Sequence, residues 1–198
     1  GLIPAAIPAY NASGMMGETD TEHPEKKANP AAEIFEEAVG FFRRAGFLPA
    51  EIPGEARGWL EPLVTAYLPD PENVAELPDR VRAIFCYDAA AALARVDIQE
   101  VVTRQRARPV IREFAHLILN EAAPDEARFE EMLGAIRART HCTGRDLMLP
   151  IRIVLTGQFR GPELRKLPPL IEEGSRLDLP ARIKSCRERV LEFCGALG

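Results

Sequence analysis

Apolar residues recur at intervals of three and four along most of the chain after residue 30, which is the spacing of one face of a helix. The first apolar stripe ends at Gly46, and the second ends before Pro69. Further stripes follow Pro78 and Pro124, and a narrow one covers the C-terminal end from Leu179 onward. No segment shows the alternation that is typical of a half-buried strand. The pattern therefore predicts an all-α fold built as a helical bundle.

Between Leu147 and Leu155 almost every residue is apolar. Pro150 near the front of this run and Gly157 just after it predict a short buried helix, with proline in the first turn and a glycine stop. Arg152 is the one charge inside the run. Because a buried guanidinium must be paired or reach an anion, Arg152 is a candidate both for holding the structure together and for binding a ligand.

Gly161, Pro162 and Glu163 follow closely. Glycine can act as an N-cap, proline fits the first helical position, and an acid complements the helix dipole, so these residues predict the start of the next helix. The stretch from Gly144 to Leu164 is thus predicted to form a helix, a tight turn and a second helix.

The chain has a net charge of −5, but the charge is polarised along it. Residues 1–103 carry 8 basic and 17 acidic side chains, whereas residues 104–198 carry 17 basic and 13 acidic ones. Any contact with phosphate is therefore expected in the second part. Arg104, Arg108 and Arg112 fall four apart and could form one basic ridge, either solvated or bound to phosphate. The candidates for phosphate binding are Arg104, Arg108, Arg145, Arg160, Arg165 and Lys166.

Two other features receive a structural interpretation. The single tryptophan, Trp59, lies on an apolar face and is interpreted as a core residue rather than as a platform for a base. The last stripe predicts a helix that begins near Leu179 and whose outward face carries Arg182, Arg187 and Arg189.

The cysteines lack metal-site spacing and are predicted to be buried thiols of a reducing cytoplasm. They are Cys86, Cys142, Cys186 and Cys194. His141 beside Cys142 could suggest a metal or a nucleophile, but no second ligand pair or orienting acid accompanies it. We therefore expect no metal, no cofactor and no catalytic residue in this chain.

Two ordered motifs resemble a known family. The run Leu149–Gly157, followed by Gly161–Leu164, resembles the signature of the C-terminal anticodon-binding region of bacterial glutamyl-tRNA synthetases. That family typically shows a Pro-Leu-Arg-x-Ala-Leu-Thr-Gly run followed shortly by Gly-Pro. Upstream, Trp59 and Leu60 followed by Leu77–Phe85 resemble the family segment in which a proline-headed helix leads into an aromatic pair and an acid.

The resemblance implies an all-α cage of the anticodon-binding type, in a cytoplasmic monomer that contacts no membrane. The implied partner is tRNA, and tRNA-Glu first of all. The motifs of the catalytic half, His-Ile-Gly-His and Lys-Met-Ser-Lys-Ser, are absent, so ATP and Mg²⁺ are expected only with a catalytic domain. The residues of the structural motif are Arg152, Thr156, Gly157, Gly161 and Pro162.

The loop before Pro71 departs from the family. Discriminating members show Arg-Pro-Arg there, and the second arginine recognises the last anticodon base. In this chain Leu68 and Asp70 take the positions of the two arginines. An aspartate can accept a hydrogen bond from cytosine N4, or it can be a solvated acid of the turn.

We expect residues 1–30 to be a mobile arm or the remnant of a preceding domain, residues 31–120 to form a first helical subdomain, and residues 121–198 a second that carries the Leu-Thr-Gly motif. The leading hypothesis is a module that binds the anticodon arm of a tRNA, part of or derived from a glutamate–tRNA ligase but without its catalytic domain. The alternative is a helical protein-interaction domain that has kept the fold and lost tRNA binding. No residue set supports an enzyme in its own right.

Overall fold

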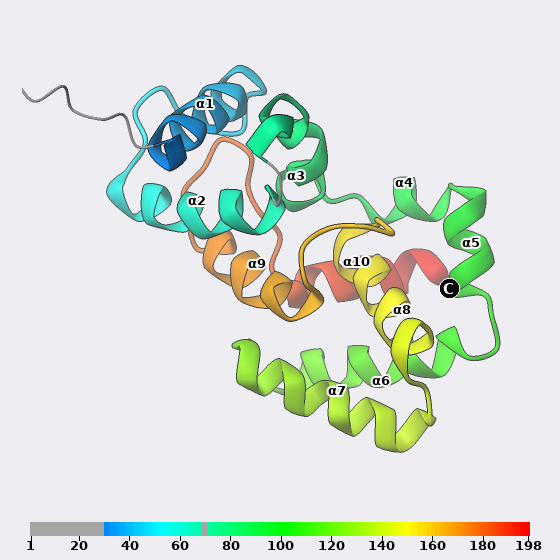
Figure 1. Cartoon of the computed structure of the whole chain (residues 1–198). Coiled ribbons are helices and arrows are strands. Elements are labelled where there is room, and N and C mark those ends of the chain that lie inside the picture. The colour runs from blue at the N-terminus through cyan, green and yellow to red at the C-terminus, as the bar shows by residue number, and fades with distance from the viewer. Residues whose placement is uncertain (1–29, 69–70) are drawn as a thin grey trace, which may run out of the picture.

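The structure, a computed structural model, describes residues 30–68 and 71–198 and no side chain of residues 71–73 (Figure 1). The expectation for residues 1–29 and the alignment of Asp70 lie outside these residues. Within the described ranges every regular element is a helix, so the all-α prediction is confirmed. The elements are α1 (Pro30–Arg44), α2 (Gly54–Tyr67), η1 (Pro71–Glu76), α3 (Leu77–Phe85), α4 (Ala89–Leu93), α5 (Val96–Val102), α6 (Ala107–Asn120), α7 (Glu126–Thr140), α8 (Gly144–Thr156), η2 (Leu164–Lys166), α9 (Leu167–Ser175) and α10 (Cys186–Leu197).

Helices from the end of the chain pack against helices from its beginning. Figure 1 shows α1, α2 and α3 grouped together, with α9 lying along α2. The last helix, α10, packs against α4, α6 and α8, while α6 and α7 form an adjacent pair. The expected division near residue 120 stays a prediction. None of the helices in the described ranges has the length and apolar character that a bilayer crossing requires.

Aromatic side chains pack together in the core next to α2. The rings of Phe47 and Phe85 stack with their centroids 4.6 Å apart, and Trp59 meets Phe85 edge-on at 5.7 Å. The indole N–H of Trp59 donates to the carbonyl oxygen of Leu170 on α9, at 2.8 Å. Gly174 allows this contact, because a Cβ at that position would lie 2.6 Å from the Trp59 ring. The interpretation of Trp59 as a core residue is confirmed.

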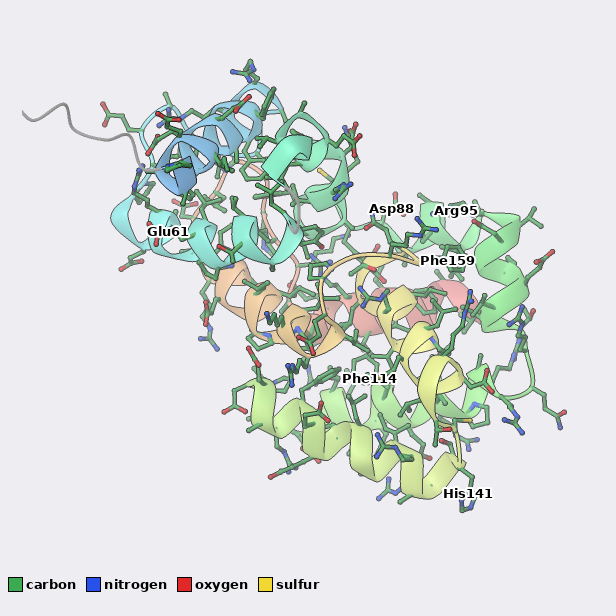
Figure 2. The ribbon with its side chains drawn as sticks, in the orientation of Figure 1. Glu61, Asp88, Arg95, Phe114, His141 and Phe159 are labelled. Atoms are coloured by element: carbon green, nitrogen blue, oxygen red, sulfur yellow. The ribbon has the colours of Figure 1, made fainter. Side chains whose placement is uncertain are left out.

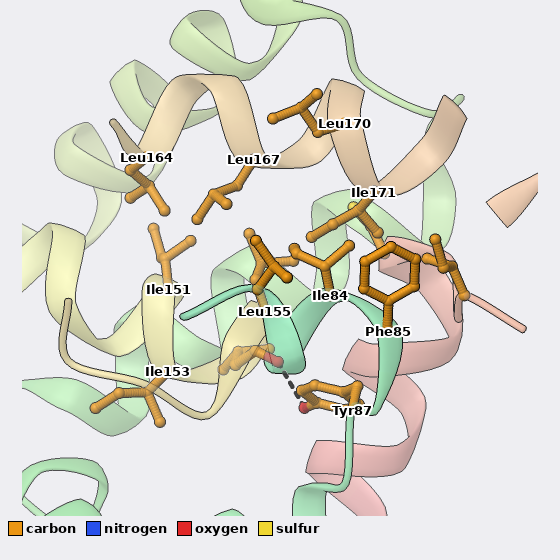
Figure 3. Packing of buried hydrophobic residues seen from close by; sticks show 14 of the residues in the cluster. Ile84, Phe85, Tyr87, Ile151, Ile153, Leu155, Leu164, Leu167, Leu170 and Ile171 are labelled. Atoms are coloured by element: carbon orange, nitrogen blue, oxygen red, sulfur yellow. Dashed lines mark hydrogen bonds between the residues drawn. The ribbon is translucent and has the colours of Figure 1, made fainter. Parts of the chain in front are cut away.

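The buried helix predicted around Arg152 is α8, and Gly157 ends it in the left-handed conformation with φ of 65°. Figure 3 shows Ile151 and Leu155 on the buried side of α8, close to Leu164 and Leu167 of the following segment. The helix begins at Gly144, so Pro150 lies inside it and not in its first turn as predicted.

The prediction that Gly161, Pro162 and Glu163 open the next helix is wrong. These residues belong to the connecting loop, and helical structure begins with η2 at Leu164. The following α-helix starts at Leu167 and takes a proline in its first turn, where the missing N–H costs no hydrogen bond.

The last helix also begins later than the apolar stripe predicts. It starts after Ser185, whose hydroxyl accepts a hydrogen bond from the N–H of Glu188, while the Glu188 carboxylate accepts one from the N–H of Ser185. This capping box fixes the helix start. Leu179 and Ile183 are buried but precede the helix.

The placement of Arg189 on the outward face of this helix is wrong, because its side chain is completely buried. Its guanidinium donates to the carbonyl oxygens of Ala83, Ile84 and Leu155, at 2.8, 2.6 and 2.8 Å. A further N–H donates to the carbonyl oxygen of Lys184 at 2.8 Å. The last carbonyls of a helix lack partners within the helix, and a cation complements that end of its dipole. Arg189 therefore joins the C-terminal ends of α3 and α8 to α10.

Tyr87 completes this junction. Its hydroxyl donates to the carbonyl oxygen of Val154 at 2.6 Å (Figure 3). Its ring lies under the Arg189 guanidinium, 4.8 Å from the ring centroid. The ammonium of Lys184 donates to the carbonyl oxygen of Tyr87 at 2.9 Å and pairs with Glu192. Burial raises the pKa of Tyr87 well above its ordinary value, so the hydroxyl remains a donor.

The prediction of buried thiols holds for Cys142 and Cys186, but Cys86 is exposed. Cys86 follows the last residue of α3 as its C-cap. Cys194 is partly exposed on α10.

Replacing Arg189 with alanine should lower the free energy of unfolding by about 3–5 kcal/mol, because buried carbonyls of two helices lose their donors. Urea denaturation followed by circular dichroism measures the change. Arg137→Ala is the matched control, since Arg137 is exposed on α7, and it should change stability by less than about 0.5 kcal/mol. Equal stability of the two variants would contradict the role given to Arg189.

Candidate nucleic-acid interface

A groove of about 980 Å³ lies beside the loop that follows α8. One wall is formed by the loop residues 158–163, and the others by the end of α2, by η1 and α3, and by Arg95 before α5. We call it the loop groove. It is lined by Ala66, Tyr67, Glu76, Asp79, Arg80, Arg95, Gln158, Phe159, Arg160, Gly161, Pro162 and Glu163. The stretch that stands out in the sequence therefore borders this groove.

Thr156 and Gly157 set the direction of the loop. The Thr156 hydroxyl donates to the carbonyl oxygen of Arg152 at 2.8 Å and accepts from the N–H of Gln158 at 3.2 Å. Gly157 lies against α4, because a Cβ on it would be 2.8 Å from the Cβ of Ala92. The positive φ and this close approach both favour glycine at this position.

Arg152 reaches from α8 to the same loop. Its Nη2 donates to the carbonyl oxygen of Pro162 at 2.8 Å and so holds the loop in place. Its Nη1 is buried and finds no hydrogen-bond partner within the described part of the chain. Burial lowers the pKa of the guanidinium. Nη2 of Arg152 therefore has the structural role, and Nη1 remains without a partner among the described residues.

Tyr67, at the end of α2, presents a second buried polar atom without a partner. Its side chain is 4% exposed, it lines the loop groove, and its hydroxyl bonds to no group that the structure describes. Burial raises the pKa of Tyr67 well above its ordinary value, so the hydroxyl stays protonated. Buried polar groups without partners are rare and costly, and they require an explanation. Sequence reasoning missed Tyr67 because it falls on the apolar stripe of α2.

The rim of the groove carries three arginines and three acids, and two of the arginines are ion-paired. Arg95 pairs with Asp97 at 2.7 Å and lies over the ring of Phe159, 5.6 Å from its centroid (Figure 2). Arg80 pairs with Glu76 at 3.0 Å. Arg160, which was predicted, is exposed on the groove, and the residues that the structure describes give it no ion pair.

The other predicted basic residues divide among separate places. Arg104 and Arg145 line one small hollow of about 20 Å³, at the end of α5 and the beginnings of α6 and α8. Arg106, which was not predicted, lines the same hollow and pairs with Asp146 at 3.1 Å. This cluster lies at two helix N-termini, where backbone N–H groups favour anions.

The three remaining predicted residues line neither this hollow nor the loop groove. Arg108 is exposed on the first turn of α6. The expected ridge of Arg104, Arg108 and Arg112 is wrong as a single helix face, because Arg104 precedes the start of α6. Arg165 pairs with Glu163 at 2.9 Å. Lys166 lines a different hollow of about 370 Å³ between α2 and α9.

His141 and Cys142 do not form a site in the structure. His141 ends α7 in the left-handed conformation, with φ of 56°. The Cys142 thiol is buried and lies 3.8 Å from the carbonyl oxygen of Arg106. Throughout the described ranges, no group of three or more histidine, cysteine or acidic side chains could hold a metal ion.

A helical scaffold with an aromatic ring, arginines and an unpartnered hydroxyl on one groove has features of a surface that binds unstacked bases. The chain belongs to the anticodon binding domain family, whose sequence profile matches residues 31–172. Its matched part is homologous to the C-terminal region of bacterial glutamate–tRNA ligases, which confirms the family suggested by the two motifs.

Three relatives illustrate this homology. Glutamate–tRNA ligase 2 of Syntrophus aciditrophicus is 29% identical over 152 residues, which are 74% of this chain and 29% of the relative. Glutamate–tRNA ligase of Desulforamulus reducens is 29% identical over 149 residues, 74% of this chain and 30% of the relative. That of Exiguobacterium sibiricum is 31% identical over 141 residues, 67% of this chain and 27% of the relative. The chain therefore spans less than a third of the length of these enzymes.

Replacing Gly157 with alanine should lower the free energy of unfolding by about 1–3 kcal/mol, because a side chain is strained at positive φ and meets Ala92. Gly195→Ala is the control, since Gly195 is helical with open space around its Cβ, and it should be neutral or stabilise by up to about 1 kcal/mol. Urea denaturation midpoints of the two variants measure the difference in stability. A neutral Gly157→Ala would show that the loop wall does not depend on this glycine.

Proposed function

We propose that this chain binds the anticodon arm of a tRNA, with tRNA-Glu as the first candidate, and that the loop groove receives bases of the anticodon loop. The observation that carries the proposal is the unpartnered hydroxyl of Tyr67, which lines a groove bordered by the family motif, together with the unpartnered Nη1 of Arg152 beside Gly161 of the loop wall. A groove that is complete without a ligand would satisfy these atoms internally.

The chemistry of the rim supports RNA as the ligand. Sequence-specific proteins recognise RNA mostly through unstacked bases, which they stack on aromatic rings or arginine planes and bind along their edges. Phe159 with Arg95 above it offers such a platform. Arg160, exposed beside them, is placed to contact a phosphate of the same strand.

We further propose that Arg104 and Arg145 bind the RNA backbone outside the groove. Two helix N-termini and three arginines against one aspartate make their hollow positive, and its volume of about 20 Å³ suits a single oxygen rather than a base. Arg108 is close in sequence and exposed, so we keep it as a candidate, together with Lys166. Arg165 ranks lower because Glu163 already neutralises it.

The complete protein, on this proposal, is a glutamate–tRNA ligase or a derivative of one that acts as a monomer in the cytoplasm. The chain spans less than a third of the ligases it resembles, so ATP, Mg²⁺ and glutamate are assigned to a catalytic part outside the matched region. The contribution of this chain is to hold the tRNA.

A second candidate function is protein interaction without RNA binding. The pairing of Arg80, Arg95 and Arg165 with neighbouring acids favours it, because these cations are neutralised within the chain. The salt dependence of binding separates the two functions, since contacts with phosphate release counterions.

The test is titration of this chain with a tRNA-Glu transcript at about 50 and about 200 mM salt. We expect Arg160→Ala to weaken binding and to reduce the salt slope by roughly one, and Arg104→Ala with Arg145→Ala to reduce it by roughly two. Arg137→Ala, which removes an exposed charge from α7, should leave the slope unchanged.

Absence of salt-sensitive tRNA binding by the unmodified chain would contradict the proposed function. Equal effects of Arg160→Ala and Arg137→Ala would show instead that only net charge matters and that the loop groove is not the site.

A further inference from the structure

Two helices connect the loop groove with the small arginine-lined hollow at the start of α8. Arg95 borders the groove just before α5, and Arg104 lines the hollow just after it. The α8 helix runs the other way, since Arg145 in its first turn lines the hollow and Phe159, shortly after its end, lines the groove. The two helices contact each other. Figure 2 shows Phe159 and His141, which precedes α8, at opposite ends of this helix. The groove and the hollow therefore lie at opposite ends of the same pair of helices.

The length of α8 sets the separation of the two places. The helix has 13 residues, which at about 1.5 Å per residue give about 20 Å. A nucleic-acid duplex advances about 3.4 Å along its axis for each base pair, so about six base pairs cover this distance. An RNA that fills both places must therefore continue well beyond the bases that enter the groove.

The hollow offers contacts for a phosphate and none for a base. Its volume of about 20 Å³ suits a single oxygen, and the described residues that line it include no aromatic ring. Arg106 pairs with Asp146 at 3.1 Å and so neutralises the acid of the lining. Arg104 and Arg145 are exposed and have no ion-pair partner among the described residues. Two guanidinium groups thus remain for the backbone of an RNA.

Positive charge continues from the hollow along α6. Arg108 and Arg112 are exposed one turn apart in the first half of this helix, and the described part of the chain gives them no ion pair. Glu113 follows Arg112, but it pairs with Arg139 of α7 at 2.8 Å. A row of unpaired arginines attracts several successive phosphates rather than one anion. We call these unpaired arginines the basic end, which consists of Arg104, Arg108, Arg112 and Arg145.

The distribution of charge decides in which direction an RNA leaves the groove. Residues 30–85, which form the group α1 to α3, carry 10 acidic and 5 basic side chains, whereas residues 104–112 carry 4 basic and no acidic ones. On α5, Asp97 is paired with Arg95, and Glu100 is a single acid against the arginines of the basic end. Phosphates are repelled on balance by the first group and attracted by the second. An RNA that leaves the groove is therefore directed along α5 and α8 toward the basic end.

We infer that the basic end binds phosphates of the base-paired stem whose loop enters the loop groove. Paired RNA hides its base edges in a deep and narrow major groove, so proteins recognise it by its shape and its backbone. Exposed guanidinium groups without an aromatic platform suit such a stem. The inference rests on the proposed RNA-binding function of the loop groove. It adds the class of RNA, which is a stem-loop held at its loop and at its stem.

The test uses two RNA hairpins that share the anticodon loop of tRNA-Glu and differ in their stems, which have about three and about eight G–C pairs. The short stem covers about 10 Å and ends before the basic end, whereas the long stem passes it. The unmodified chain should bind the long hairpin roughly tenfold more tightly at about 50 mM salt, and the salt slope should be steeper by roughly two.

Variants assign this preference to particular side chains. Arg104→Ala combined with Arg145→Ala should weaken binding of the long hairpin roughly tenfold and leave the short one unchanged, because only the long stem reaches these arginines. Arg160→Ala should weaken both hairpins, since both loops enter the groove. Arg43→Ala combined with Arg44→Ala is the matched control, because it removes two exposed arginines from α1 and should change neither hairpin.

The outcomes separate the inference from the function it rests on. Equal affinity of the unmodified chain for both hairpins overturns the inference. Equal weakening of both hairpins by the Arg104 and Arg145 changes overturns it too, since the basic end would then contact the loop. The same holds if the stem preference survives these changes or is also lost with Arg43 and Arg44. In each case salt-sensitive binding of the hairpins leaves the proposed function standing. If neither hairpin nor tRNA-Glu binds, the proposed function fails and the inference fails with it.

Discussion

The structure depends on one buried guanidinium. Arg189 donates to carbonyl oxygens at the ends of α3 and α8 and to the segment before α10, so three parts of the chain meet at a single side chain. Those helix ends carry the loop groove, because α8 leads into its loop wall and Tyr67 lies within reach of the Arg189 charge. An apolar residue could fill the same volume, but it would leave these carbonyls without donors. The geometry of the groove therefore follows from a polar contact in the core.

Buried polar groups in the core and near the groove differ in whether they have hydrogen-bond partners. The Nε, Nη1 and Nη2 atoms of Arg189 each donate to a carbonyl oxygen. In contrast, Arg152 Nη1 and the Tyr67 hydroxyl have no partner among the described residues. A folded chain tolerates such atoms when a ligand satisfies them, and functional sites are where this exception is expected.

Local signals in the sequence predicted where α8 ends, but they misplaced the starts of α8, α9 and α10. The stop at Gly157 follows from the conformational freedom of a glycine directly after the apolar run. Periodicity could not place Arg189 correctly, because its partners lie about a hundred positions away and supply backbone oxygens, which leave no mark on a pattern of side chains. The same limit applies to Tyr67. Its stripe predicts burial, which is correct, but the lack of a partner appears only when α2 and the loop after α8 are brought together.

The distribution of charge along the chain predicted which basic residues bind phosphate, but not where they lie in the structure. The polarity of the chain pointed to Arg104, Arg145 and Arg160, and the structure divides them between a helix-terminal hollow and the loop groove. The central claim of the proposed function is that the loop groove receives the anticodon loop. Photo-crosslinking of a tRNA-Glu transcript with 4-thiouridine in the anticodon loop, followed by mass spectrometry, tests that claim most directly. The account predicts crosslinked peptides that contain Phe159 or Tyr67, and crosslinks confined to α1 or α7 would contradict it.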